Sequence, residues 1–185
     1  MPGRLFVLDR DGVINRDSPD FVKAPDEWVP LDGSLEAIAR LTRGGYTVAV
    51  ASNQSGLARG LFDKPTLGAI HDKMLAAVVA AGGRIDRIEI CPHGPDEGCD
   101  CRKPAPGLLR RLGRRYGIDL RGVACIGDSE RDLAAASAVG ARPMLVRTGN
   151  GARTEKSLLE RGETVEVYDD LLAAAQQLLD EGAPA

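Results

Sequence analysis

The 185-residue sequence has few aromatic residues, only two histidines and no long hydrophobic run. Phe, Trp and Tyr make up 4% of the chain and the net charge is -3, which argues against a surface built for nucleic acids. No stretch approaches the ~18 consecutive apolar residues that a transmembrane helix needs. The N-terminal apolar run is shorter than the ~7–15 residues of a secretory signal, so we expect a cytoplasmic protein without membrane or nucleic-acid partners.

The remaining composition is that of a folded protein. Hydrophobic residues make up 43% and charged residues 28% of the chain, which excludes a disordered protein. The length fits one domain, since domains usually contain about 100–200 residues. We therefore expect a single domain over residues 1–185 that functions as a monomer.

Short apolar runs alternate with amphipathic segments along most of the chain. The runs predict β-strands at 5–8, 46–51, 85–90, 123–126, 144–146 and, more weakly, 165–167. The amphipathic segments predict helices at 34–43 (with Ser34 as N-cap), 65–81, 105–116, 130–139 and 169–181. The stretch 149–162 and the tail 182–185 are expected to be the loosest parts. This alternation predicts an α/β fold, a doubly wound parallel sheet with helices on both faces and no separate cap domain.

Polar residues follow four of the predicted strands, where ligands bind in open parallel sheets. Asp9 and Asp11 follow the first strand and Ser52 follows the second. Lys103 comes after the third strand, and Asp128 follows the fourth. Because these positions converge on one edge of the sheet, we expect the side chains to form a single site.

Three carboxylates, a hydroxyl and a lysine suit phosphoryl transfer. Carboxylate oxygens and substrate phosphate are the ligands that Mg²⁺ prefers. A carboxylate nucleophile would form an aspartyl-phosphate, and a second carboxylate would serve as acid and then as base. Lys103 and Ser52 would neutralise charge on the phosphoryl oxygens. The predicted reaction is hydrolysis of a phosphomonoester.

A second cluster lies between the third strand and Lys103. Cys91, His93, Cys99 and Cys101 have the spacing C-x-H-x5-C-x-C. Four thiolate and imidazole ligands are typical of a closed, structural Zn²⁺ site, although a chance group of reduced thiols is the alternative. Cys125 lies within an apolar run and is interpreted as a core residue.

These motifs resemble those of the haloacid dehalogenase superfamily. The matching residues are Asp9-Arg10-Asp11-Gly12, Ser52, Lys103 and Gly127-Asp128-x-x-x-Asp132. The resemblance implies that Asp9 is the nucleophile and Asp11 the acid/base. It also implies that Ser52 and Lys103 bind phosphate, and that Asp9, Asp128 and the Asp11 backbone carbonyl bind Mg²⁺.

Longer segments resemble the heptose bisphosphate phosphatase family within that superfamily. They are LDRDGVIN (8–15), SNQSGLARG (52–60) and CDCRKP (99–104). The resemblance implies removal of the 7-phosphate of a phosphorylated heptose in the ADP-heptose pathway of lipopolysaccharide synthesis. It implies substrate contacts at Asp9, Arg10, Asp11, Asp17, Asp20, Ser52, Asn53, Gln54, Ser55, Arg102, Lys103 and Ser129. Ser52 stands where threonine is commoner, and Ser129 replaces a lysine of some members.

Other functions share part of this pattern. Histidinol-phosphate phosphatases of histidine biosynthesis have the same motifs and a similar Cys/His loop, and they remain the alternative. A phospho-accepting receiver domain carries its aspartate after the third strand, where this chain has the Cys/His loop. A zinc-stabilised binding module has no need of intact Asp9, Asp11, Lys103 and Asp128. Arg59 is interpreted either as a ligand of an anionic substrate or as a solvated loop residue.

Overall fold

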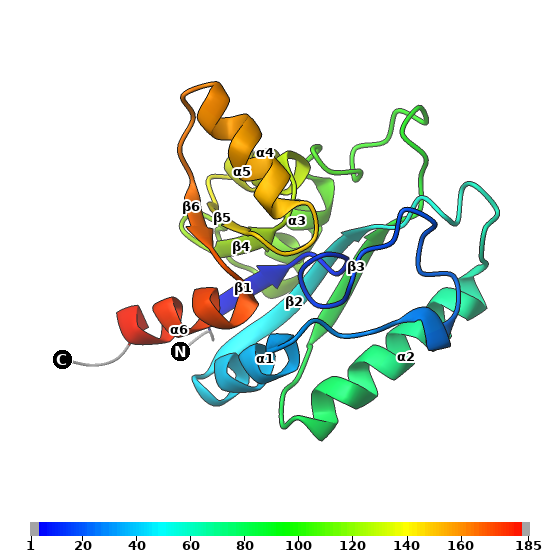
Figure 1. Ribbon diagram of the computed structural model, residues 1–185, viewed down its shortest axis with the longest axis horizontal. Coiled ribbons are helices and arrows are strands. Elements are labelled where there is room, and N and C mark those ends of the chain that lie inside the picture. The colour runs from blue at the N-terminus through cyan, green and yellow to red at the C-terminus, as the bar shows by residue number, and fades with distance from the viewer. Residues whose placement is uncertain (1–3, 183–185) are drawn as a thin grey trace.

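The computed structural model describes residues 4–182, which form one six-stranded parallel sheet with helices on both faces (Figure 1). The strand order is β3-β2-β1-β4-β5-β6. The strands are β1 (Arg4–Leu8), β2 (Tyr46–Asn53), β3 (Arg87–Cys91), β4 (Ala124–Gly127), β5 (Arg142–Val146) and β6 (Glu166–Tyr168). The predicted fold class is therefore confirmed.

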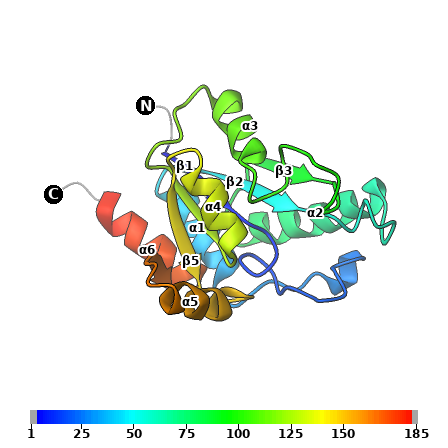
Figure 2. The same cartoon turned by 90° about the horizontal axis from the view of Figure 1, so that it is seen from above.

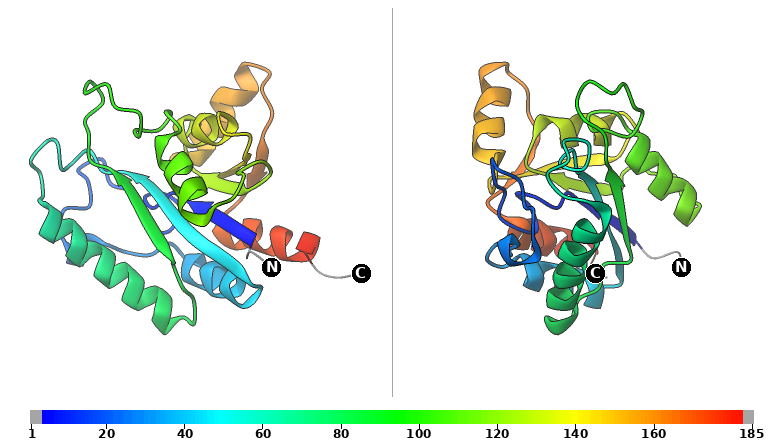
Figure 3. Two further views of the ribbon diagram at one scale, coloured as in Figure 1. Left: turned by 180° about the vertical axis from the view of Figure 1, so that it is seen from behind. Right: turned by 90° about the vertical axis from the view of Figure 1, so that its right-hand side faces the viewer.

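The central strands alternate their side chains between two hydrophobic layers. Phe6 and Leu8 of β1 pack into one layer, whereas Leu5 and Val7 pack into the other. The first layer is covered by α1 (Ser34–Arg43), α2 (Lys64–Ala80) and α6 (Leu171–Gly182). The second face is covered by α3 (Gly107–Tyr116), α4 (Glu130–Ser137) and α5 (Gly151–Glu160). The left view of Figure 3 shows the two groups of helices on opposite sides of the sheet, and Figure 2 shows α3 and α6 on opposite sides of it.

The order of the strands reverses between β1 and β4, which are neighbours in the sheet. Chain connections run away from this point in both directions, so a crevice forms beyond the carboxyl ends of the two strands. The loops after β1, β2, β3 and β4 all begin at this edge. The sheet topology thus places the predicted catalytic residues together before any side-chain contact is considered.

The long segment after β1 is anchored to the body of the protein. Trp28 is 1% exposed and belongs to the larger core cluster. The Lys73 ammonium donates to the backbone carbonyls of Pro25 and Trp28. These contacts secure the one 3-10 turn of this segment, at Pro25–Glu27, against α2.

Two local predictions were wrong. The stretch 149–162, expected to be loose, contains α5, which packs Leu158 against Leu145. Gly33, at φ 74°, is the N-cap of α1, and Ser34 is the first helical residue. The Ser34 hydroxyl instead donates to the carbonyls of Ile14 and Leu31, tying the first loop to the helix. No helix within residues 4–182 is both long and apolar enough to cross a membrane.

Candidate active site

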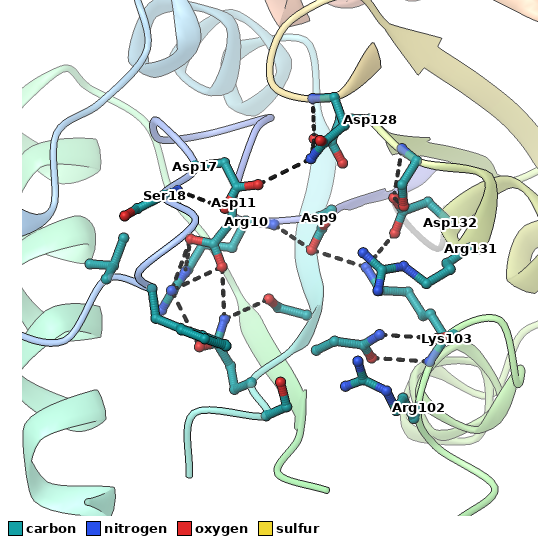
Figure 4. Close-up of a pocket in the computed structure, with 18 of the residues that line it drawn as sticks. Asp9, Arg10, Asp11, Asp17, Ser18, Arg102, Lys103, Asp128, Arg131 and Asp132 are labelled. Atoms are coloured by element: carbon teal, nitrogen blue, oxygen red, sulfur yellow. Dashed lines mark hydrogen bonds and ion pairs between the residues drawn. The ribbon is translucent and has the colours of Figure 1, made fainter. Parts of the chain in front are cut away.

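A pocket of about 270 Å³ lies at the carboxyl edge of β1 and β4 (Figure 4). Of the residues predicted to contact substrate, Asp9, Arg10, Asp11, Asp17, Ser52, Asn53, Gln54, Ser55, Arg102, Lys103 and Ser129 line it. Asp20 is exposed and does not contribute to its wall. The metal-ligand candidate Asp128 also lines the pocket.

Asp9 follows β1 directly and is held by a buried lysine. Lys103 Nζ lies 3.0 Å from Asp9 Oδ1 and 2.5 Å from Asp132 Oδ1. The same ammonium donates to the Ala51 carbonyl at 2.7 Å, so its three protons all have partners within the protein. Burial alone would lower the pKa of Lys103, but Asp132 and Asp9 raise it above its ordinary value. A permanent positive charge is therefore fixed beside the Asp9 carboxylate.

Two carboxyl groups in the pocket are hard to ionise. Burial, opposed by Lys103 and reinforced by Asp132 and Asp128, raises the pKa of Asp9 to about 7. Burial also raises the pKa of Asp128 to about 6. A divalent cation between these groups would relieve both shifts, because it supplies charge where the protein has crowded acids.

The donor set around these acids fits magnesium. Carboxylate oxygens of Asp9, Asp128 and Asp132 lie within 4.8 Å of one another. Asp132 is already engaged by Lys103 and by Ser129, which leaves Asp9 and Asp128 as the available side-chain ligands. The Asp11 backbone carbonyl accepts no hydrogen bond from residues 4–182, so it is free to act as a third oxygen ligand. An all-oxygen set with room for water is the coordination that Mg²⁺ prefers.

The Asp11 carboxylate faces away from Lys103 and into a clamp around Arg10 (Figure 4). Its oxygens accept hydrogen bonds of 2.9 Å from Arg10 Nη2 and Asn15 Nδ2, and of 3.0 Å from Gln54 Nε2. Burial raises the pKa of Asp11, but the Arg10 charge and these hydrogen bonds outweigh burial and lower it. Asp11 is thus held as a carboxylate, which is the form of a base and not of an acid.

Arg10 itself is 1% exposed and is backed by a neutral histidine. Arg10 Nη1 lies 3.3 Å from Nε2 of His71 on α2. Burial and the Arg10 charge lower the pKa of His71 to about 4, so its ring nitrogen can accept at neutral pH. The Arg10 guanidinium therefore has internal partners in Asp11, Gln54 and His71, which hold it beside the Asp11 carboxylate.

The residues after β2 connect the pocket to the Cys/His loop. Asn53 Nδ2 donates to the Lys103 carbonyl, and the Lys103 N–H donates to Asn53 Oδ1, both at 3.0 Å. This reciprocal pair fixes the backbone of Lys103. Ser52 is 1% exposed, and its hydroxyl oxygen accepts a hydrogen bond of 2.9 Å from Gln54 Nε2. Gln54 consequently bridges the predicted phosphate-binding hydroxyl and Asp11.

Asp128 sits in a space that only glycines leave open. A Cβ on Gly12 (φ 80°) or Gly149 (φ 57°) would collide with Asp128 Oδ2. Thr154 of α5 donates to the Asp128 carbonyl at 2.9 Å, and Thr148 donates to the Gly12 carbonyl at 2.7 Å. The loops after β1, β4 and β5 are thereby joined around one carboxylate.

Besides Arg10, three guanidinium groups lie in the pocket wall, from Arg59, Arg102 and Arg131. Arg59 stacks over the Phe21 ring at 5.6 Å, and Arg102 Nη1 donates to the His93 carbonyl. No carboxylate in the described part of the chain forms an ion pair with any of the three. They form a cationic group in the pocket wall, which we call the cationic side of the pocket.

The Cys/His cluster assembles beside this cationic side. Cys101 Sγ lies 3.3 Å from both Cys91 Sγ and His93 Nδ1, and Cys91 Sγ lies 3.6 Å from Cys99 Sγ. Tetrahedral zinc bonds of about 2.3 Å to sulfur and 2.0 Å to nitrogen would place such atoms roughly 3.5–3.8 Å apart. The cysteines are free, and their separations far exceed the ~2.05 Å of a disulfide. The four donors therefore match a zinc-sized tetrahedron.

Several residues of the site had no assigned role in the sequence prediction. Asp132 belongs to a recognised motif, but its contact with Lys103 required the geometry. Asn150 and Arg131 line the pocket from helix starts, where a polar residue looks like an ordinary cap or surface residue. His71 lies mid-helix with no neighbouring signal, and only the fold brings it to Arg10.

Known proteins resemble this chain in sequence and structure. The family model described as HAD-hydrolase-like matches residues 100–174. D-glycero-beta-D-manno-heptose-1,7-bisphosphate 7-phosphatase of Bordetella bronchiseptica is 58% identical, covering 96% of this chain and 99% of that protein. The Pseudomonas putida enzyme of the same name is 54% identical, covering 95% of this chain and 99% of its own length.

Solved structures agree with these relatives. The crystal structure of D,D-heptose 1,7-bisphosphate phosphatase from B. bronchiseptica, complexed with magnesium and phosphate, superposes with a TM-score of 0.92 at 58% identity. It covers 96% of this chain and 99% of that one. The Burkholderia thailandensis protein gives a TM-score of 0.73 at 45% identity, covering 95% and 98%. This chain belongs to the D-glycero-beta-D-manno-heptose-1,7-bisphosphate 7-phosphatase family of HAD-like hydrolases.

Proposed function

We propose that this chain hydrolyses the 7-phosphate of D-glycero-β-D-manno-heptose 1,7-bisphosphate, the activity for which its relatives are named. The observation that carries the proposal is the Asp9–Lys103–Asp132 arrangement beside Asp128 at the reversal point of the sheet. It combines a nucleophilic carboxylate, a fixed cation and a metal-ligand set in one pocket. The overall identity of the relatives supports the substrate.

Asp9 is the nucleophile in this proposal. Its oxygen attacks phosphorus, the bond from phosphorus to the sugar oxygen breaks, and an aspartyl-phosphate forms. The Lys103 ammonium contacts Asp9 Oδ1 and favours the ionised form of Asp9. Its positive charge would also neutralise a phosphoryl oxygen bound beside Asp9. The Ser52 hydroxyl donates to a second phosphoryl oxygen once a substrate replaces part of its present hydrogen bonding.

Magnesium completes the electrostatics of the reaction. Asp9, Asp128 and the Asp11 carbonyl would hold the ion, as the oxygen donor set suggests. Bound Mg²⁺ would screen the nucleophile from the like charge of the phosphate and stabilise negative charge in the transition state. The relative from B. bronchiseptica was crystallised with magnesium and phosphate, which supports this cofactor.

Asp11 is the acid/base of the proposal, and its protonation state has to change during the reaction. It has to protonate the leaving sugar oxygen and later accept a proton from the attacking water. The Arg10 clamp favours the ionised state and therefore opposes the first of these steps. We infer that a bound phosphomonoester displaces Asp11 from Arg10, which raises its pKa and turns it toward the leaving group.

The cationic side of the pocket favours a bisphosphate over a monophosphate. Lys103 and the magnesium ligands can serve only the phosphate that is attacked. Arg102 and Arg131 lie in the same wall without carboxylate partners and can bind the phosphate that is retained. Arg59 supplies a further positive charge above the loop that carries Phe21.

Zinc is proposed as a structural metal, bound by Cys91, His93, Cys99 and Cys101. Burial raises the pKa of Cys99, but hydrogen bonds from the backbone of Arg102 and Cys101 outweigh it and lower the pKa to about 7. This favours a thiolate at one corner of the tetrahedron. The metal would order the loop that carries Arg102 and Lys103 into the pocket.

The test compares Mg²⁺-dependent phosphate release from the heptose bisphosphate and from histidinol phosphate at equal enzyme concentration. We expect kcat/KM at least a hundredfold higher for the heptose, a transition-state preference of about 2.7 kcal/mol. Phosphorus NMR of the product should show heptose 1-phosphate. Preference for histidinol phosphate would overturn the substrate assignment, and full activity of Asp9→Asn would overturn the mechanism.

A further inference from the structure

Asn150 joins two carboxylates that come from different loops of the pocket. It is the N-cap residue of α5, the helix that begins after β5. Its side-chain Nδ2 lies 3.1 Å from Asp17 Oδ2 and 3.1 Å from Asp128 Oδ2. Its backbone N–H also donates to Asp128 Oδ2 at 2.8 Å. One residue thus contacts the loop that carries Asp17 and the proposed magnesium ligand Asp128 at once.

The orientation of this amide is fixed by a third partner. Arg153 Nη2 donates to Asn150 Oδ1 at 2.8 Å, which places the oxygen of the amide on the side of α5. The NH₂ group then faces the pocket, where it has two protons for two carboxylate acceptors. The reversed amide would set a carbonyl oxygen against both carboxylates and a donor against Arg153. Only the observed orientation satisfies all three contacts.

The hydrogen bonds from Asn150 leave only one carboxylate oxygen of Asp128 for a cation. Oδ2 receives both donors of Asn150 and is packed against Gly12 and Gly149. Oδ1 has no donor among residues 4–182, and it is left for a ligand shared with Asp9. Hydrogen bonds of this kind orient metal ligands, and losing one commonly costs about 10–100-fold in metal affinity.

For Asp17, Asn150 supplies an anchor outside its own loop. Asp17 is exposed on the segment that follows the first strand, and it lines the pocket. Within that segment its Oδ1 accepts only the neighbouring Ser18 N–H, at 2.8 Å. The contact with Asn150 spans 133 residues of sequence and is its one hydrogen bond to another part of the described chain. Without it, little would hold the Asp17 side chain over the pocket.

We propose that Asn150 is a positioning residue that couples the substrate-binding loop around Asp17 to the magnesium site. The inference rests on the proposed function, because it assumes that Asp128 binds Mg²⁺ and that the Asp17 loop faces the sugar. Ordering of Asp128 by the cation orders Asn150, and Asn150 in turn orders Asp17. By reciprocity, substrate held by the loop strengthens magnesium binding by the same factor.

The experiment uses Asn150→Ser, because serine is a good N-cap and preserves the start of α5 but cannot reach both carboxylates. Hydrogen exchange of residues 16–22 is followed by mass spectrometry with and without Mg²⁺, in the absence of substrate. We expect Mg²⁺ to slow exchange of this segment at least threefold in the parent protein and not in the variant. Asn150→Ala provides a second test, and Lys156→Ala, exposed on the same helix, is the control that should behave like the parent.

Two further measurements separate coupling from a general structural defect. Calorimetric Mg²⁺ titration should show binding about tenfold weaker for Asn150→Ser, and within twofold of the parent for Asp17→Ala. KM for the heptose bisphosphate should rise about fivefold in each variant and no further in the double variant. The coupling would be overturned if the two KM increases multiplied in the double variant. It would also be overturned if Mg²⁺ still slowed the exchange of residues 16–22 in Asn150→Ser. Absence of heptose turnover by the parent would defeat the proposed function alone, because the exchange and titration results need no substrate.

Discussion

Replacing the proposed nucleophile Asp9 with asparagine should make the magnesium-free protein more stable at neutral and higher pH. In the parent protein the pKa of Asp9 is raised from 3.8 to about 7, chiefly by burial. A shift of about three units corresponds to roughly 4 kcal/mol of lost stability when the group must ionise. The Asp9→Asn variant keeps the shape of the side chain and removes this cost.

The sign of the pH dependence follows from the proton count. Between about pH 4 and pH 7 the folded protein keeps a proton on Asp9 that the unfolded chain has released, so the free energy of unfolding falls as pH rises. The variant lacks this titration. Its advantage should therefore reach about 4 kcal/mol at pH 8 and shrink below about 2 kcal/mol at pH 5.

Urea unfolding at several pH values measures this difference. With a slope of about 2 kcal/mol/M, the midpoint of Asp9→Asn should lie about 2 M higher than that of the parent at pH 8. Saturating Mg²⁺ should narrow the gap, because it binds the parent carboxylate and not the amide. A variant that is less stable than the parent at pH 8, or an advantage that does not vary with pH, would refute the reasoning.

Three other substitutions test the remaining parts of the site. Lys103→Met should abolish turnover and lower the free energy of unfolding by about 3–5 kcal/mol, because it leaves buried acids without their cation. The double variant Lys103→Met/Asp132→Asn should recover part of that lost stability in urea unfolding. Arg131→Ala should raise KM for the bisphosphate about tenfold while kcat stays within threefold, and an unchanged KM would remove Arg131 from substrate binding. Cys101→Ser should lower the zinc content measured by mass spectrometry from one atom per chain and reduce the melting temperature, and an unaltered zinc content would contradict the proposed site.

The sequence was sufficient for the fold and for the residues at the strand ends. Apolar runs of three to six residues alternating with amphipathic segments predict a parallel sheet almost directly. The convergence of Asp9, Ser52, Lys103 and Asp128 then follows from topology, because parallel strands end on one edge. The sequence did not predict α5, because the residues at its start, Thr148-Gly149-Asn150-Gly151, are typical of a turn. The apolar face of the helix is also short.

Side-chain pairing was the part that sequence could not supply. Arg10 and Asp11 are adjacent in the chain, yet the clamp also needs His71 from α2 and Gln54 from the next loop. Asn53 was predicted to contact substrate and lines the pocket, but no sequence pattern indicated that both ends of its amide bind the backbone of Lys103. These contacts join residues that are 44 to 61 positions apart in the chain, and a local sequence pattern carries no information on such pairs.

The reciprocal contact between Asn53 and Lys103 has a consequence for how this enzyme family can diversify. Lys103 is held by a residue at the end of β2, so its position does not depend on the path of the chain between the zinc-ligand candidates His93 and Cys99. That stretch can lengthen, shorten or exchange side chains while the reacting phosphate still meets the same ammonium. The same loop holds Arg102, whose Nη1 donates to the His93 carbonyl, so a change near His93 would move a cation of the pocket wall and leave Asp9 and Lys103 in place.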